Sequence, residues 1–272
     1  MKKKKLRLKK KVIYYFLFII PIPLLIFSTI QIILWLNDAP KTKDIIKEIE
    51  EVTDVIEYDN NETEIIESDE HPDTPYWNFI KMNLIDVDFT ELKNTNNDTV
   101  AWLYVGGTNV NYPVVQTTDN EFYLDHSFDK SKNSAGWLFM DYRNNSKNYE
   151  KNTIIYAHNR KDKTMFGTLK NVLAKIWYED IDNRVIKMSS ENINTLWQIF
   201  SVYTIETTND YIQTKFENDN EFQKFINLIK GRSTANFNTK VTTNDKILTL
   251  STCHGNTKKL VIHAKLIKQE KK

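Results

Sequence analysis

KILTLSTCHGNTKKLVIHAKL, residues 246–266, contains two apolar runs separated by the polar segment HGNTKK. Leu, Ile, Val and Thr dominate both runs, and residues of this kind favour β-strands. The segment therefore predicts two strands near the end of the chain. Cys253, the single cysteine among 272 residues, ends the first run, so we expect its thiol at the rim of the fold and not in mid-core.

Further short β-type runs precede this segment and are separated by Asn, Asp and Gly. Together with the two runs above they make eight, at residues 99–105, 109–116, 135–142, 152–158, 183–190, 194–206, 245–252 and 258–267. Eight runs in one domain predict a mainly β fold with a closed or nearly closed barrel.

Helical segments are expected at three places in this β pattern. One or two short helices open the domain within residues 76–94. Apolar residues at helical spacing predict a helix over 165–176 and another over 220–231, before the last two strands. The second ends at Gly231, which we expect to act as its C-cap.

The N-terminal part of the chain divides by charge. Residues 1–11 carry eight positive charges and no acid, and residues 12–37 carry no charge at all. This pattern predicts a transmembrane helix over 12–37, with a cytoplasmic basic tail and the remainder outside the membrane. A cleaved signal peptide is disfavoured because the apolar run is long and no A-x-A site follows it. Residues 75–272 are then an extracytoplasmic domain.

Residues 38–74 are strongly acidic and connect the anchor to the domain. Isoleucines and valines between 45 and 56 form a helical stripe, whereas residues 59–75 have the composition of a solvated segment. Two interpretations stay open for this linker: a tether extended by self-repulsion, or a helix that packs on another part of the chain.

A single cysteine in an exported domain cannot form an internal disulfide, so Cys253 is either buried or used. Most free cysteines are small core residues, but this one is exported, single and at a strand end. A thiol nucleophile needs a proton acceptor, usually histidine. Among the five histidines, His158 is the best candidate because it also follows a predicted strand. His254 is adjacent to the cysteine and would point to the opposite face.

TLSTC at residues 249–253 and YAHN at 156–159 resemble the sortases, cysteine transpeptidases of Gram-positive cell surfaces. The resemblance extends over nearly all of residues 75–268, and the opening helices and the helical insert before the last strands favour class B. Papain-like thiol hydrolases are disfavoured, because they place the cysteine before the histidine and here His158 precedes Cys253. The resemblance implies a closed eight-stranded sortase-type barrel.

The resemblance also implies an activity. Cys253 would attack the Thr carbonyl in the C-terminal sorting signal (NPxTx or LPxTG-like) of exported surface proteins and form a thioacyl-enzyme. His158 would protonate the leaving amine and then deprotonate an incoming peptidoglycan amino group, from a precursor or a cross-bridge. A membrane anchor fits this role, because it holds enzyme and substrate at one surface.

The chain departs from the family at its oxyanion-binding arginine, because Lys259 occupies the position where sortases carry that residue. Lysine keeps the charge but loses the planar fork of donors. Lys259 could do the work less well, Arg143 or Arg232 could reach in, or the enzyme could be weak. The alternatives are therefore a weakly active or non-catalytic module that binds sorting signals, and a pilin-polymerising sortase.

Four further residues match positions where class B enzymes contact the sorting signal: Ser251, Thr207, Tyr211 and Ile212. Ordinary packing is the alternative role for each of them. The sequence shows no Cys, His or carboxylate cluster at metal-ligand spacing, so we expect no metal and no cofactor. The expected partners are the surface proteins, the peptidoglycan amine and the membrane, and we expect no nucleic acid.

Overall fold

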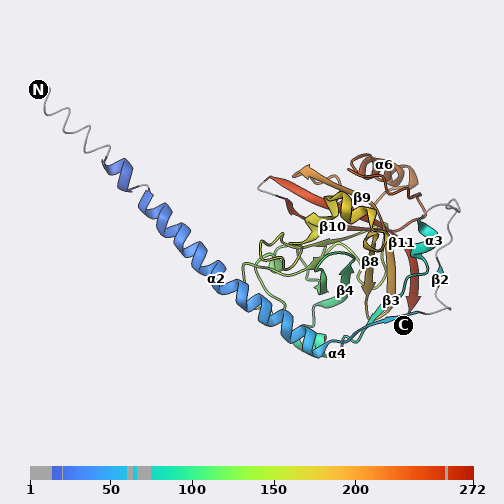
Figure 1. Cartoon of the computed structure of the whole chain (residues 1–272), viewed down its shortest axis with the longest axis horizontal. Helices are drawn as coiled ribbons and strands as arrows, with labels where there is room; N and C mark the ends of the chain where they lie inside the picture. Colours follow the sequence, from blue (N-terminus) through green and yellow to red (C-terminus); the bar gives the residue numbers. More distant parts are fainter. Residues whose placement is uncertain (1–13, 20, 60–63, 66–74, 255–256) are drawn as a thin grey trace, which may run out of the picture.

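A computed structural model describes residues 14–19, 21–59, 64–65, 75–254 and 257–272. For residues 34, 35, 64, 65, 253 and 254 it describes the backbone alone. The predicted basic tail at 1–11 lies outside the described residues, as does His71. Figure 1 shows a barrel with one long helix, α2, that projects away from it toward the N-terminus.

Eight strands close into a barrel, as predicted. Their order around the ring is β10-β7-β6-β5-β4-β8-β9-β11, and pairing of β10 with β11 completes it. Most neighbours are antiparallel, but β10–β7 and β5–β6 are parallel, so the barrel is mixed. The bounds are β4 Thr99–Val105, β5 Asn111–Val115, β6 Phe139–Met140, β7 Asn152–Tyr156, β8 Val185–Ser189, β9 Ile193–Glu206, β10 Ile247–His254 and β11 Lys258–Lys271.

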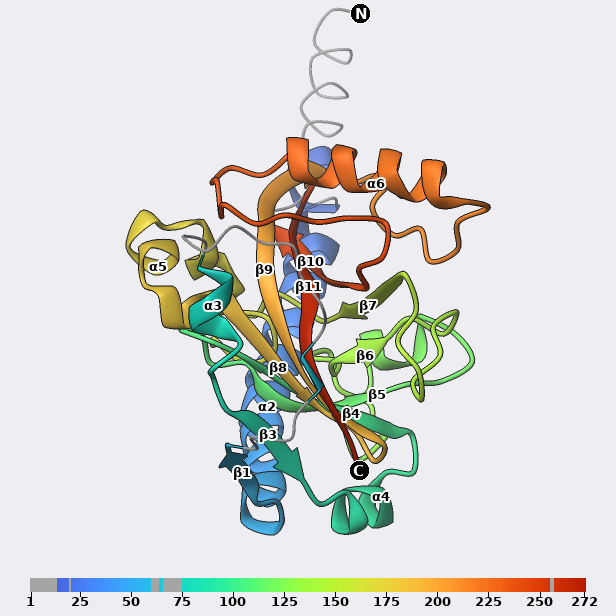
Figure 2. The ribbon, with the colours of Figure 1, turned by 90° about the vertical axis from the view of Figure 1, so that its right-hand side faces the viewer.

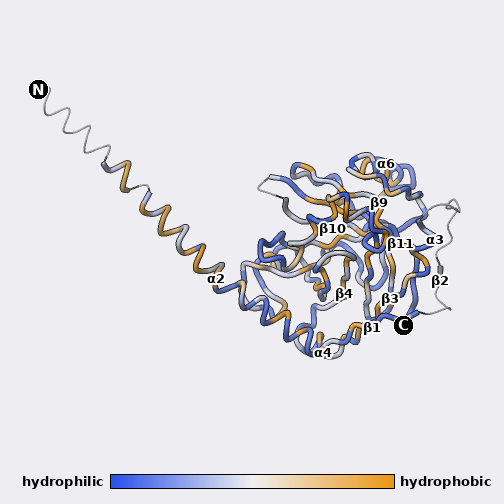
Figure 3. Tube along the Cα trace, in the orientation of Figure 1, coloured by the Kyte–Doolittle hydropathy of each residue, from blue (hydrophilic) through white to orange (hydrophobic). Residues whose placement is uncertain are grey.

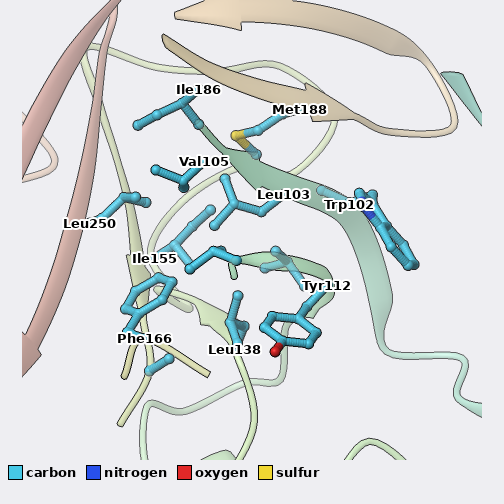
Figure 4. Packing of buried hydrophobic residues seen from close by; sticks show 14 of the residues in the cluster. Trp102, Leu103, Val105, Tyr112, Leu138, Ile155, Phe166, Ile186, Met188 and Leu250 are labelled. Atoms are coloured by element: carbon cyan, nitrogen blue, oxygen red, sulfur yellow. The ribbon is translucent and has the colours of Figure 1, made fainter. Parts of the chain in front are cut away.

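The barrel interior is an apolar core to which all eight strands contribute. Figure 4 shows part of it, with labelled residues from β4, β5, β7, β8 and β10. On β10, Leu248 and Leu250 enter this core, whereas Ile247 joins a second cluster beneath helix α6. Side chains alternate in direction along a strand, so Thr249 and Ser251 share the face of Ile247. Both are buried, and their hydroxyls bind the side chains of Asn152 and Tyr211. Strand β10 is therefore covered on both faces.

Helix α6, Asp219–Gly231, covers the second cluster at one end of the barrel (Figure 2). The Asn218 side chain accepts a hydrogen bond from the Glu221 amide and caps the helix. The predicted apolar stripe is confirmed, since the buried residues of α6 are Phe222, Phe225, Ile226 and Ile229. Gly231 is the last helical residue and the cap is Arg232, so the predicted glycine cap is shifted by one residue.

The segment expected to be one helix at 165–176 is instead two short pieces. A 3-10 helix, η2 Leu169–Leu173, is followed by Ala174 in an extended conformation and by α5 Lys175–Glu179. Ile176, expected on the buried face, is 84% exposed. The expectation failed because Met165 has a positive φ of 53° and cannot begin a regular helix.

The short helices predicted at the start of the domain are α3 Tyr76–Phe79 and α4 Thr90–Thr95. Between them lies β3 Leu84–Val87, which pairs with β1 Val55–Tyr58 in a two-stranded sheet. The remaining short elements are β2 Glu64–Ile65, η1 Phe122–Leu124 and η3 Ile181–Arg184. Strand β1 belongs to the acidic linker, so part of the linker adds to the fold.

Helix α2 runs without a break from Pro21 to Val52. The helix over Tyr14–Val52 is long and apolar enough to cross a membrane. Hydrophobic residues fill its N-terminal half, away from the barrel, and polar residues appear where it meets the barrel (Figure 3). There Ile45 and Ile49 are buried in the main core. Of the two interpretations of the linker, the packed helix therefore holds for this part.

Candidate active site

The site is formed where three strands end at one rim of the barrel. Strand β7 ends just before His158, β10 carries Cys253 next to its last residue, and β11 begins at Lys258. These three strands are neighbours, because β10 pairs with β7 on one side and with β11 on the other.

Strand register relates the nucleophile candidate to the two others. Within the parallel β10–β7 pair, the last register partners are Ser251 and Tyr156, and Cys253 and His158 each follow two residues later. On the other side, Cys253 is the register partner of Lys259. The backbone therefore places Cys253 opposite Lys259, and β10 beside the strand that leads to His158.

A cleft of about 330 Å³ opens at this rim. Its lining includes each predicted site residue whose side chain is described: His158, Lys259, Ser251, Thr207, Tyr211 and Ile212. The residues come from the loop after β7, from β10 and β11, and from the segment between β9 and α6, which are far apart in sequence. The structure thus brings the predicted set together, while their roles stay predictions.

The His158 ring is half-buried and held by one hydrogen bond, in which Nε2 lies 2.7 Å from the carbonyl oxygen of Leu124. A carbonyl oxygen can only accept, so Nε2 carries the proton and the neutral ring keeps Nδ1 as its acceptor. Gly136 lies behind the ring, with a positive φ of 60°. A Cβ at Gly136 would come within 3.0 Å of His158 Cδ2 and 2.9 Å of the Leu124 oxygen. The bare glycine is therefore required for this arrangement.

The two arginines considered as replacements for the family's arginine form ion pairs with other residues. Arg143 donates to both carboxylate oxygens of Asp141, at 2.8 and 2.7 Å. Arg232 binds the carboxylate of Asp210 and lies over the ring of Tyr203. Neither lines the cleft, whereas Lys259 does. Of these three cationic residues, Lys259 is thus the one at the rim.

Arg143 instead supports the wall of the cleft. Its Nη2 also donates to the carbonyl of Ile212 at 2.9 Å, and Tyr156 donates to Asp141 at 2.9 Å. Burial acts to raise the pKa of Asp141, but the hydrogen bonds from Arg143 outweigh it and hold the pKa below its usual value. The carboxylate therefore stays charged and can hold the segment that contains Ile212.

The segment that follows β9 is fastened at further points. The hydroxyls of Tyr211 and Ser251 are 2.9 Å apart, and Asn152 Nδ2 donates to the carbonyl of Gln213 at 2.8 Å. Thr207 binds the carbonyl of Thr257 through both its amide and its hydroxyl. These bonds fix the outer wall against β7, β10 and the start of β11.

Sequence reasoning missed several contributors to the cleft, among them Asn120, Leu124 and Thr252. Asn120 and Leu124 line it from the loop around η1, and Leu124 also supplies the carbonyl that holds His158. Thr252 lines it too, and its buried hydroxyl has no hydrogen-bond partner among the described residues. A backbone carbonyl leaves no signal in the side-chain sequence. Thr252, next to the cysteine, could have been noted.

Two other histidines make packing and hydrogen-bond contacts that support the fold. His263 is fully buried between the hydroxyls of Thr249 and Tyr203, at 2.8 and 2.9 Å, and burial lowers its pKa to about 3. His126 stacks on the ring of Phe122, with ring centroids 4.0 Å apart. Among the histidines whose side chains are described, His158 is the one that lines the cleft.

The chain is similar to known proteins in family, sequence and structure. A family model described as the sortase domain matches residues 103–267. Sortase B of Staphylococcus aureus is 39% identical over 184 residues, covering 66% of this chain and 75% of the relative. Sortase B of Listeria monocytogenes is 39% identical over 165 residues, covering 60% of this chain and 65% of the relative.

Solved structures of sortase B also match the chain. A Staphylococcus aureus sortase B-substrate complex matches with a TM-score of 0.62 and 39% identity, over 66% of this chain and 84% of that one. Sortase B from Bacillus anthracis, in complex with AAEK1, matches with a TM-score of 0.68 and 30% identity, over 86% and 99% of the two chains.

Proposed function

Because the chain belongs to the sortase family and is a class B sortase transpeptidase, we propose that Cys253 is its nucleophile. In this proposal His158 is the general acid and base, and Lys259 stabilises the oxyanion. The observation that supports it is the strand arrangement: Cys253 pairs with Lys259, its strand β10 pairs with β7, which leads to His158, and His158 and Lys259 line one cleft.

In the first half-reaction, the thiolate of Cys253 attacks the Thr carbonyl carbon of a C-terminal sorting signal of the NPxTx or LPxTG type. The C–N bond breaks, the leaving amine takes a proton from His158, and the acyl group remains as a thioester. In the second, a peptidoglycan amine attacks the thioester and gives its proton to His158. The new amide is released and the thiolate is restored.

Lys259 supplies positive charge where the tetrahedral intermediate carries its oxyanion. A preorganised donor at that point acts more strongly in a partly desolvated cleft than in water. Lysine offers a point charge in place of a planar fork, so it holds the oxyanion with less geometric constraint than arginine would.

The proposed substrates are exported proteins that carry the sorting signal, together with the amino group of a peptidoglycan precursor or cross-bridge. We place the catalytic domain, residues 75–272, outside the membrane, with residues 12–37 as the anchor. The apolar helix over Tyr14–Val52 and the positive charge of residues 1–11 support this orientation. The cleft then faces the compartment through which both substrates pass.

The test uses the full chain in lipid nanodiscs with a labelled peptide of the NPxTx type and an amine-bearing peptide. We expect a ligated product in the mass spectrum, and none with Cys253→Ala. Lys271→Ala, at the far end of β11, is the matched control and should retain activity. Ligation that persists in Cys253→Ala would overturn the proposal.

A further inference from the structure

The barrel is fastened to α2 by polar contacts, one of which, at Thr42, is buried. Asp38 accepts hydrogen bonds from the amide and hydroxyl of Ser134, at 3.0 and 2.6 Å. One turn later the hydroxyl of Thr42, which is fully buried, accepts from Asn133 at 3.0 Å. With Ile45 in the core, these contacts hold the barrel at a fixed place along the helix.

A second cavity, of about 550 Å³, lies between α2 and the loop that follows β7. Gln31 and Ile32 line it from the helix, and His158 and Lys161 are among its lining residues from the loop. The catalytic loop is thus next to residues that belong to the uncharged run 12–37. Since α2 is continuous from Pro21 to Val52, the distance between run and barrel is fixed.

Helix geometry gives the depth of this cavity in the proposed membrane. A hydrocarbon layer of about 30 Å takes up about 20 helical residues. Counted from residue 12, where the positive charges end, the layer finishes near Gln31. The headgroup region adds roughly 5 to 8 Å, or about four to five residues. Gln31 and Ile32 therefore lie where hydrocarbon gives way to headgroups.

We propose that the loop at residues 158–161 rests on the outer surface of the membrane at headgroup depth, with Lys161 against the phosphate of an anionic phospholipid. This inference rests on the membrane orientation proposed above. In Figure 1 the N-terminal part of α2 and the C-terminus of the chain lie on opposite sides of the barrel, so the far end of β11 stays away from the membrane.

The charges of the loop suit this partner. Arg160 is bound to Asp162 at 2.7 Å, so these two opposite charges offset one another. Lys161 and Lys163 are exposed. A cation near an anionic membrane surface contributes about 1 kcal/mol to binding. Ile32 gives the cavity an apolar wall on its membrane side, so the cavity has the polarity of a bilayer boundary.

The test measures depth at single positions. Because Cys253 is the single cysteine, Cys253→Ala gives a background in which Asn159→Cys or Lys271→Cys carries one fluorophore. The full chain is placed in nanodiscs that contain phosphatidylcholine spin-labelled on its headgroup, which quenches nearby fluorophores. We expect quenching at position 159 to be at least threefold that at 271. Equal quenching at the two positions would overturn the inference.

Lipid charge tests the contact of Lys161. In discs with about 30% phosphatidylglycerol, Lys161→Glu should reduce quenching at position 159, whereas the matched variant Lys161→Arg should leave it unchanged. In neutral discs the two variants should agree. Identical quenching of both variants in the anionic discs would show that Lys161 does not bind the lipid phosphate.

These measurements need no turnover, because the nucleophile is absent from the labelled protein. A failure of the proposed reaction would leave the quenching pattern intact. If the helix does not span the bilayer, the chain will be released from the membrane at alkaline pH, which flotation on a density gradient detects. That result would remove the basis for the depth and overturn the inference.

Discussion

The wall and the rim of the cleft are built in different ways. In the wall, Asp141 is fully buried and receives hydrogen bonds from Arg143 and Tyr156, while Arg143 also binds the carbonyl of Ile212. Each polar group there is bound to another. Such a network resists movement, because a buried group that loses its partner is costly.

At the rim, strand register and a single ring hydrogen bond set the geometry. Cys253 and Lys259 are placed as backbone partners in β10 and β11, and a bond from Nε2 to the carbonyl of Leu124 holds His158. The contrast teaches that a buried polar network maintains the shape of the wall, whereas the rim depends on strand register. Substitutions at the rim should therefore change the rate, and those in the wall should change stability.

The largest effect is expected at His158. His158→Ala should lower kcat/KM about 10³-fold, since no other group would move the proton. The barrel should unfold at an unchanged temperature, because the ring makes one partly exposed hydrogen bond. Peptide ligation and thermal unfolding measure the two quantities, with His126→Ala as control. A loss below tenfold would show that another group serves as the base.

Low pH should lower the stability of the fold through the buried residue His263. His263 is fully buried with a pKa of about 3, against 6.5 when exposed. Its neutral form therefore stabilises the fold above pH 6.5, and this contribution is lost as the pH falls towards 3. We expect the free energy of unfolding to decrease by about 3 kcal/mol between pH 7 and 4.5 from this residue. Denaturant unfolding at the two values measures it.

His263→Gln should remove this part of the pH dependence, and His126→Gln should retain it. The comparison isolates one histidine from the carboxylates, which also titrate in acid. An equal dependence on pH in the wild type and in His263→Gln would mean that the buried ring does not govern acid stability.

Substitutions of Lys259 distinguish the effect of its positive charge from the effect of its donor geometry. Lys259→Ala should lower kcat/KM about 100-fold, as expected for the loss of an oxyanion donor. Lys259→Arg should keep or raise it, because the planar fork adds donors. Unfolding temperatures should stay close to that of the wild type. If neither substitution alters the rate, a different residue binds the oxyanion.

A substitution in the wall of the cleft should change the stability of the fold and not the rate. Arg143→Ala leaves the buried Asp141 without its cation, and should lower the free energy of unfolding by about 2 kcal/mol, less than for a fully buried pair because Arg143 is one-third exposed. Since the pKa of Asp141 lies below its usual value, this contribution is present above about pH 4 and is lost in acid. Denaturant unfolding at pH 7 and at pH 3 measures the difference.

Arg143→Lys is the matched control and should recover part of the loss, since it keeps the charge. A variant of Arg143 that loses activity at unchanged stability would contradict the division between wall and rim.

The barrel could be predicted because each strand has a local signal. β-branched and aromatic runs bounded by turn residues mark all eight strands, and the stripe at 222–229 marks the buried face of α6. The prediction of the main site residues rests on a related signal. Cys253 and His158 each follow an apolar run, and strand ends meet at one rim.

Features that depend on distant partners could not be predicted. The stripe of Ile45 and Ile49 was visible, but the acidic composition around it suggested solvent, and nothing local shows that it packs on the barrel. The carbonyl of Leu124 holds His158 through backbone atoms that any residue would supply. Met165 was assigned to a helix because hydrophobic spacing does not show the sign of φ.

The central claim is that Cys253 accepts the acyl group, and intact-mass spectrometry of the enzyme tests it most directly. The full chain, incubated with a peptide of the NPxTx type and quenched in acid, should gain the mass of the peptide up to its Thr, without the leaving portion. Proteolysis should locate this mass on Cys253. Ligated product with no adduct, or with an adduct on another residue, would contradict the account.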